Sequence, residues 1–326
     1  MSPQNKLLSF VLLTSSISLW GQELYPLNEP ASTVPKGVLG VRLFTENYKE
    51  VDRTRSLYAV RFMYGVTPRL TVLTNISTSN HHNTKLPPDL ITHSHVGSQT
   101  YYYTHAIKRG VKYPFLFNGV HVLAKYRFLS VDKEHEHFRM AAVAEWSSVA
   151  VAHDEAEPNL VDDTGGYGGG MIVTWLRNRF ASSFTYGFIW PNAYFEMQTD
   201  VSGGPDLPTR IYYGNASKFN LSFGYLFYPK HYTSYKDPNW NVYLEFLGKQ
   251  YNAATVIQNG NNLPTKTVAL VKNTYVEIHP GIQRIVNSNF RMDLTVGFSL
   301  FHQSYAHFTP VWMFAVQRYF YRTGKK

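Results

Sequence analysis

The stretch "KFNLSFGYLFYP", residues 218–229, contains two interleaved sets of side chains. Alternate positions from Phe219 to Phe227 are apolar, while the positions between them are mostly small or polar. A period of two predicts a β-strand with one apolar and one polar face. In a soluble sandwich the apolar face packs on a second sheet, whereas in a membrane barrel it faces lipid. The rest of the chain distinguishes these two possibilities.

The same alternation recurs along most of the chain, in segments of roughly ten residues, which is the length needed to cross a bilayer as tilted strands. Three of these segments (168–176, 240–249 and 273–286) fit the pattern less well. With 218–229, the segments predict an all-β chain that forms a transmembrane antiparallel up-and-down β-barrel of about 12 strands. The remaining segments are 37–44, 55–66, 69–76, 119–129, 138–146, 179–190, 290–300 and 310–320.

The connections between these segments alternate between short and long. Outer-membrane barrels have short turns on the periplasmic side and long loops outside, and an even number of strands places both termini in the periplasm. A soluble sandwich or propeller is the alternative, but no internal repeat of fixed period is visible. The short connections are 66–69, 130–137, 177–179, 228–239 and 287–289, and the longer ones are 47–54, 80–118, 153–167, 191–214, 252–272 and 303–308.

Composition agrees with a barrel. Charged residues make up 16% of the chain, below the roughly 25% of soluble domains, while aromatic residues also reach 16%. Beyond the N-terminus the sequence contains no apolar run of the ~18 residues that a membrane helix requires. The C-terminal stretch "TPVWMFAVQRYFY" alternates to its end and is predicted to close the barrel against the first strand, with Phe314 opposite Val41 or nearby.

The N-terminus has the layout of a secretory signal peptide: Lys6, a short apolar stretch and a small residue before the predicted cleavage after Gly21. We therefore expect a signal peptide at 1–21 and one barrel domain at 22–326, located in the bacterial outer membrane. The chain has no cysteine, so it lacks both disulfides and a lipid-attachment site. Export argues against nucleic acid as a partner for the formal charge of +9. The short stretch before the first strand predicts no plug domain.

Four motifs resemble those of uncharacterised bacterial outer-membrane barrels labelled as meta-pathway phenol-degradation-type proteins or putative outer-membrane transporters. The motifs are "ASTVPKGVLGVRLF", "GYGGGMIVTWLRNRF", "NLSFGYLFYP" and the C-terminal "VQRYFY". The resemblance extends over most of the predicted mature chain and implies the barrel fold and the passage of small molecules. It supplies no catalytic residues, and its motifs specify fold better than function.

Charged residues and histidines in the predicted strands occupy the positions that alternate with the lipid face. Because Arg or Lys facing lipid costs ~2–4 kcal/mol at mid-membrane, these side chains must line water or pair with one another. Cations outnumber anions among them, which predicts a net-positive channel for small solutes, anionic or aromatic. The alternative is an interior packed with ion pairs that does not conduct. The predicted lumen-lining residues are Arg42, Arg61, His121, Lys125, Arg127, Arg139, Glu145, Lys218, Glu245, Lys249, Glu277, His279, Arg291 and Asp293.

Two loops contain residues that could ligate metals. The acidic loop 153–170 could offer oxygen ligands to Ca²⁺, although its spacing matches no EF-hand. The alternatives are a solvated acidic rim or a loop that folds in to pair with luminal arginines. The largest loop is rich in histidine, but no known metal-site spacing appears there. No cofactor is predicted. The acidic candidates are Asp154, Glu155, Glu157, Asp162 and Asp163, and the histidines are His81, His82, His93, His95 and His105.

An enzyme is not predicted, because the chain has no G-x-S-x-G motif and no serine and carboxylate assigned beside His279 or His302. The sequence therefore predicts an outer-membrane channel or transporter. Its expected partners are outer-membrane lipid, a small-molecule solute and the outer-membrane assembly machinery. The alternatives are a non-conducting structural or adhesive barrel and, after it, a barrel lipid hydrolase.

Overall fold

Every regular element in the computed structural model is a β-strand over the residues that the structure describes. The predicted signal peptide 1–21 lies outside these residues. No described helix is long and apolar enough to cross a membrane. The described residues are 25–50, 53–81, 114–149, 151, 157–199, 204–231, 234, 236–263, 271–302, 304 and 308–321.

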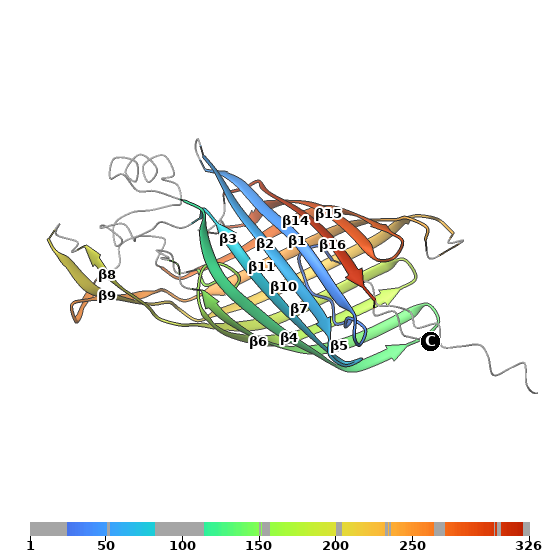
Figure 1. Cartoon of the computed structure of the whole chain (residues 1–326), viewed down its shortest axis with the longest axis horizontal. Coiled ribbons are helices and arrows are strands. Elements are labelled where there is room, and N and C mark those ends of the chain that lie inside the picture. The colour runs from blue at the N-terminus through green and yellow to red at the C-terminus, as the bar shows by residue number, and fades with distance from the viewer. Residues whose placement is uncertain are drawn as a thin grey trace, which may run out of the picture.

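Twelve of the strands form a closed barrel (Figure 1), in which sequential barrel strands pair antiparallel and β1 pairs with β16. The prediction of an antiparallel barrel of about 12 strands is therefore confirmed. The barrel strands are β1 (Leu39–Glu50), β2 (Arg53–Gly65), β3 (Leu70–Ser79), β4 (Leu116–Asp132), β5 (Glu136–Val149), β6 (Gly166–Arg177), β7 (Phe180–Pro191), β10 (Ala216–Tyr228), β11 (Asn239–Tyr251), β14 (Asn273–Val286), β15 (Phe290–Phe301) and β16 (Val311–Phe320).

The apolar side of the strands forms the outer surface of the barrel. In β10, Leu221 and Tyr225 are 39% and 47% exposed, whereas Ser222 between them is fully buried. The outward aromatic side chains also contact one another across strands: Phe223 stacks on Phe180 with ring centroids 6.1 Å apart and meets Phe246 edge-on. This surface matches the apolar exterior that a barrel presents to lipid.

As expected, the last strand closes the barrel against the first, but the register of the pair differs from the prediction. Phe314 lies opposite Thr45, four residues beyond the predicted Val41, which pairs with Arg318. A shift by an even number of residues keeps every side chain on its own face, so the alternation pattern alone cannot exclude it. Leu39 pairs with Phe320, and therefore the barrel begins and ends on the side of the short 66–69 turn.

A second sheet, which the sequence did not predict, is built from the two longest described connections. β8 (Tyr194–Thr199), β9 (Asp206–Tyr212), β12 (Thr255–Gln258) and β13 (Asn261–Leu263) form four strands in the order β13-β12-β9-β8. Figure 1 shows β8 and β9 projecting beyond the end of the barrel. Ile211 and Val256 of this sheet pack in one buried cluster with Leu160, Ile189 and Tyr251.

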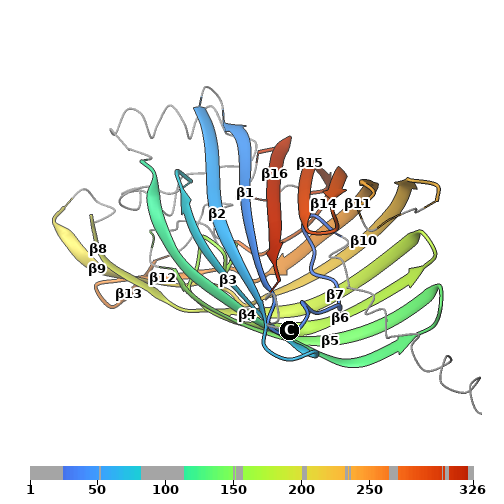
Figure 2. The ribbon, with the colours of Figure 1, turned by 45° about the vertical axis from the view of Figure 1, so that its right-hand side comes forward.

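Residues 25–35, here called the luminal segment, run inside the barrel before β1 begins. Figure 2 shows this blue segment within the curve of the wall. The backbone N–H of Asn28 donates to Glu245 on β11 at 2.9 Å, and that of Val34 donates to Thr71 on β3, also at 2.9 Å. The luminal segment thus spans the interior between distant strands. The sequence predicted no plug domain before the first strand and did not anticipate this segment, although an extended chain of this length is enough to cross the lumen.

Candidate functional site in the barrel lumen

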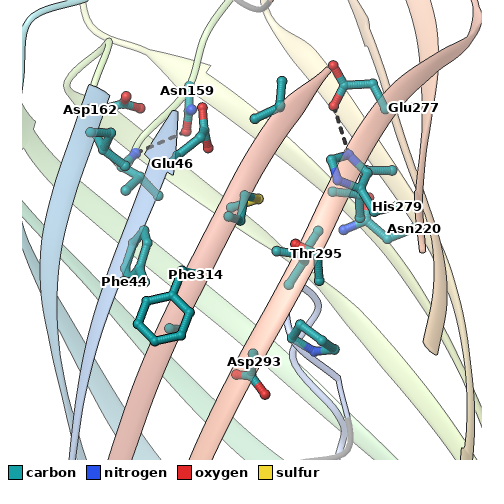
Figure 3. A pocket seen from close by; sticks show the side chains of 18 of the residues that line it. Phe44, Glu46, Asn159, Asp162, Asn220, Glu277, His279, Asp293, Thr295 and Phe314 are labelled. Carbon is teal, nitrogen blue, oxygen red and sulfur yellow. Dashed lines mark hydrogen bonds and ion pairs between the residues drawn. The ribbon is translucent and has the colours of Figure 1, made fainter. Parts of the chain in front are cut away.

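The lumen contains a cavity of about 290 Å³, here called the chamber. Pro26 and Leu27 of the luminal segment border it, and so do Asn159, Val161 and Asp162 of the connection between β5 and β6. Its remaining lining comes from the inward faces of barrel strands (Figure 3). The chamber therefore adjoins two segments that fold into the barrel.

The second inward segment, residues 157–164, is here called the inner loop. Glu157 anchors it, with 1% of its surface exposed. Its carboxylate accepts hydrogen bonds from Lys249 at 3.0 Å, from Ser304 at 2.7 Å and from the hydroxyl of Tyr275. These partners lie on β11, on β14 and between β15 and β16, so one buried carboxylate joins the inner loop to several parts of the wall.

Asp162 of the inner loop lies beside His81, just beyond the end of β3. Asp162 is 3.5 Å from His81, between Oδ2 and Nδ1. Burial and the neighbouring carboxylate of Asp163 raise the pKa of Asp162 above its usual range, against the opposing effect of His81. Asp162 is therefore easier to protonate in the docked inner loop than in water.

Glu29 is the ionic anchor of the luminal segment. Its two carboxylate oxygens accept from Arg61 at 2.8 Å and from Lys125 at 3.0 Å. Burial raises the pKa of Glu29, but the positive charges of Lys125 and Arg61 outweigh it and lower the pKa to about 2. Glu29 thus remains ionised and neutralises two of the predicted lumen-lining cations, with a partner that does not come from a strand.

A second carboxylate, Asp293, lies between two arginines. Arg42 and Arg291 approach it at 3.0 and 2.9 Å, and all three side chains are at most 6% exposed. Arg42 also donates to the backbone carbonyl of Pro26. This network connects β1 and β15 to the luminal segment.

On the opposite part of the wall, Glu145 is shared by His121 at 3.0 Å and by Lys218. Gly168 makes this arrangement possible, because a Cβ at that position would lie 2.5 Å from Glu145 Oε1. The glycine of the "GYGGG" run therefore gives the carboxylate the space it occupies.

Glu245 has no cationic partner among the bonds that the structure shows, although it is fully buried. It accepts from the backbone N–H groups of Leu27 and Asn28 at 2.9 Å each and from the hydroxyl of Ser222 at 3.0 Å. A buried carboxylate is tolerated when such donors surround it. Glu245 therefore fixes the position of the luminal segment.

Seven of the fourteen predicted lumen-lining residues do not line the chamber, and two of these seven lie near the short-turn end of the barrel. The seven are His121, Lys125, Arg127, Arg139, Glu145, Glu245 and Arg291. Arg139 binds Asp132 at 2.7 Å, and Arg127 donates to the carbonyl of Pro68 at 3.1 Å. Neither arginine lines the chamber.

The chamber has a polar and an apolar side. Glu277, His279 and Thr295 lie together on β14 and β15, and the Nε2 of His279 is 3.1 Å from Glu277 (Figure 3). Phe44 of β1 lies across from them. Leu57 and Met313 add to the apolar lining from β2 and β16.

The predicted metal ligands are only partly described. Glu157 binds a lysine rather than joining an acidic cluster, while Asp154, Glu155, His82, His93, His95 and His105 lie outside the described residues. Within the described part of the chain, no group of three or more His, Cys, Asp or Glu side chains could hold a metal ion.

Glu29 was not among the predicted luminal residues, whereas Glu157 belongs to the acidic loop that was expected either to bind Ca²⁺, to form a solvated rim or to fold in and pair with luminal arginines; its cationic partner is Lys249. The expected excess of positive charge counted strand residues only. These two carboxylates, from segments that carry no alternation, neutralise Arg61, Lys125 and Lys249. One feature of the sequence could have predicted this role of Glu29. It is a lone carboxylate between Pro26 and Pro30, and a cation buried on a strand requires an anionic partner from another part of the chain.

No protein-family model matches the sequence, and no curated protein matches it. Among solved structures, the chain is similar to an outer-membrane channel from Pseudomonas putida F1, with a TM-score of 0.53, 10% identity and coverage of 91% of this chain and 100% of that one. It also matches the NanC porin at a TM-score of 0.43 and 10% identity, over 87% of this chain and 99% of that one. The first likeness shows a shared fold. With the closed barrel and its apolar exterior, it places this chain among bacterial outer-membrane β-barrels.

Proposed function

We propose that this protein is a passive outer-membrane channel whose solutes pass through the lumen and pause in the chamber. The observation that carries the proposal is the chamber itself: about 290 Å³ of space remains in the lumen although two segments fold into it. Side chains just fill the interior of an eight-stranded barrel, so twelve strands leave room for the two segments and the cavity, and a barrel built only as a scaffold has no need of the cavity.

The known channels support this proposal by analogy of fold. The similar structure from Pseudomonas putida F1 is an outer-membrane channel. The resemblance to meta-pathway phenol-degradation-type barrels also implies small organic solutes. We include in the proposal that the chain is inserted by the outer-membrane assembly machinery after removal of residues 1–21, and that it is not an enzyme.

The luminal charges favour uncharged over anionic solutes. Glu29, Glu157 and Asp293 each hold the cations nearest to them at 3.0 Å or less. An anion would have to displace one of these carboxylates from a buried pair, at a cost of several kcal/mol. The expected attraction of anions requires luminal cations without partners. Arg61, Lys125 and Lys249 instead pair with Glu29 and Glu157.

The second candidate is a non-conducting structural or adhesive barrel. The observation that favours it is that the luminal segment and its ion pairs occupy part of the lumen. Planar-bilayer recordings on refolded protein separate the two. Discrete current steps are expected for a channel, and a folded protein that carries no current indicates a scaffold. Turnover of phospholipid in the same membranes would instead point to an enzyme.

A further inference from the structure

Two chamber-lining residues on β14 and β15 each have a buried polar atom with no hydrogen-bond partner among the described residues: Nδ1 of His279 and the hydroxyl of Thr295. Both residues line the cavity, and they are 2% and 1% exposed. Leaving a buried hydrogen-bonding group without a partner is unfavourable, and native structures rarely do so without a reason. Two such atoms on one wall indicate a place where a bound molecule supplies the missing partners.

Strand pairing brings the two side chains together. Gly281 pairs with Thr295, and the same register places His279 opposite Gly297. His279 and Thr295 are therefore diagonal neighbours on the inward face, at a separation that one small polar group can bridge. Each leans over a glycine: a Cβ at Gly297 would lie 2.3 Å from His279 Cε1, and one at Gly281 would lie 2.5 Å from Thr295 Cγ2.

The partner of His279 determines which ring nitrogen faces the chamber. With Glu277 ionised and the imidazole neutral, the Nε2 that lies 3.1 Å from the carboxylate donates to it and Nδ1 is left as an acceptor. The Thr295 hydroxyl can donate or accept. A ligand hydroxyl satisfies both atoms, because it donates to Nδ1 and accepts from Thr295.

The rest of the chamber determines the body of the ligand. Phe44 lies across from the polar wall (Figure 3), and Leu57, Val311 and Met313 extend the apolar lining. The volume of about 290 Å³ is near the lower limit of ligand pockets. A charged ligand gains little here, since the lining cations already bind carboxylates.

We infer that the chamber is a binding site for a small uncharged amphiphile with one hydroxyl group. The hydroxyl lies between His279 and Thr295, and the apolar body contacts Phe44, Leu57 and Met313. This inference rests on the proposed function for its biological meaning, but binding itself requires no conduction.

Saturation-transfer NMR on refolded protein in nanodiscs tests the site, with three probes that share a cyclohexane ring: cyclohexanol, methoxycyclohexane and cyclohexanecarboxylate. Cyclohexanol is expected to show saturable binding, and the other two to bind more weakly, because one lacks a donor and the other is charged. Thr295→Val and His279→Phe should each weaken cyclohexanol binding roughly threefold to tenfold, as expected for one lost hydrogen bond.

Thr74→Val is the matched control, because Thr74 lies on the outward face of β3 and should leave binding unchanged. Gly297→Ala tests the geometry independently by displacing the His279 ring. Tighter binding of the carboxylate than of cyclohexanol, or unchanged cyclohexanol binding in both polar variants, overturns the site. Ion current without cyclohexanol binding would support the channel function and reject the binding site. Cyclohexanol binding without ion current would support the binding site and reject the channel function.

Discussion

Glu29→Gln should release the luminal segment from the barrel wall. The substitution removes the negative charge shared by Arg61 and Lys125 but keeps the shape of the side chain. The Lys125 side chain is only 2% exposed, so its charge would remain buried without compensation. Breaking a buried pair from one side costs roughly 3–5 kcal/mol, which corresponds to a hundredfold or greater increase in the released population.

A single cysteine can report this release, because the chain contains none of its own. Ser32 is 6% exposed within the luminal segment, and Ser32→Cys changes the side chain little. In the Glu29→Gln background, maleimide labelling at this position should accelerate by about a hundredfold, and the unitary conductance in planar bilayers should rise. Glu134→Gln is the control, since the Glu134 side chain is 89% exposed on a short turn. Labelling and conductance equal to those of the unsubstituted barrel would refute the role of Glu29.

Three further predictions concern the same barrel. The pKa of Glu29 is lowered, so its anchoring is fully present above pH 4.5 and is lost as pH falls toward about 2; the unitary conductance should stay constant from neutral pH down to 4.5 and rise below it, and a conductance that does not rise would contradict the anchor. Glu157→Gln should loosen the inner loop by leaving Lys249 buried without its carboxylate, seen as more frequent gating transitions in single-channel records, while steady currents would contradict the anchor. Phe223→Arg should destabilise the barrel by ~2–4 kcal/mol in urea unfolding in lipid, whereas Phe223→Leu should cost far less; equal effects would argue against a lipid-facing position.

The sequence determined the barrel well because alternation is a local property. Each lipid-facing strand must repeat with period two, and the aromatic positions of 218–229 face outward in β10 as the pattern predicts. Strand stagger is different: it depends on how the whole sheet closes, so the partner of Phe314 was displaced by four residues without any change of face. The small sheet was missed because its strands are short and lie in segments interpreted as loops.

The contents of the lumen were the least predictable part. Ser222 is one of the small or polar positions of 218–229 and points inward as the alternation predicts, but it is fully buried beneath Asn28 and Glu245 rather than in contact with water. The luminal segment has no periodicity to reveal its position. Its contacts depend on backbone N–H groups meeting side chains distant in the sequence, which no local pattern records.

The central claim is that solutes cross through a lumen narrowed by the luminal segment. The most direct test is the unitary conductance of two proteins in planar bilayers: residues 22–326 and the same chain without residues 25–35, each first shown to migrate as a folded barrel. We predict discrete currents from residues 22–326 and a larger unitary conductance after the deletion. Two folded barrels that both remain silent, or that conduct equally, would contradict the claim.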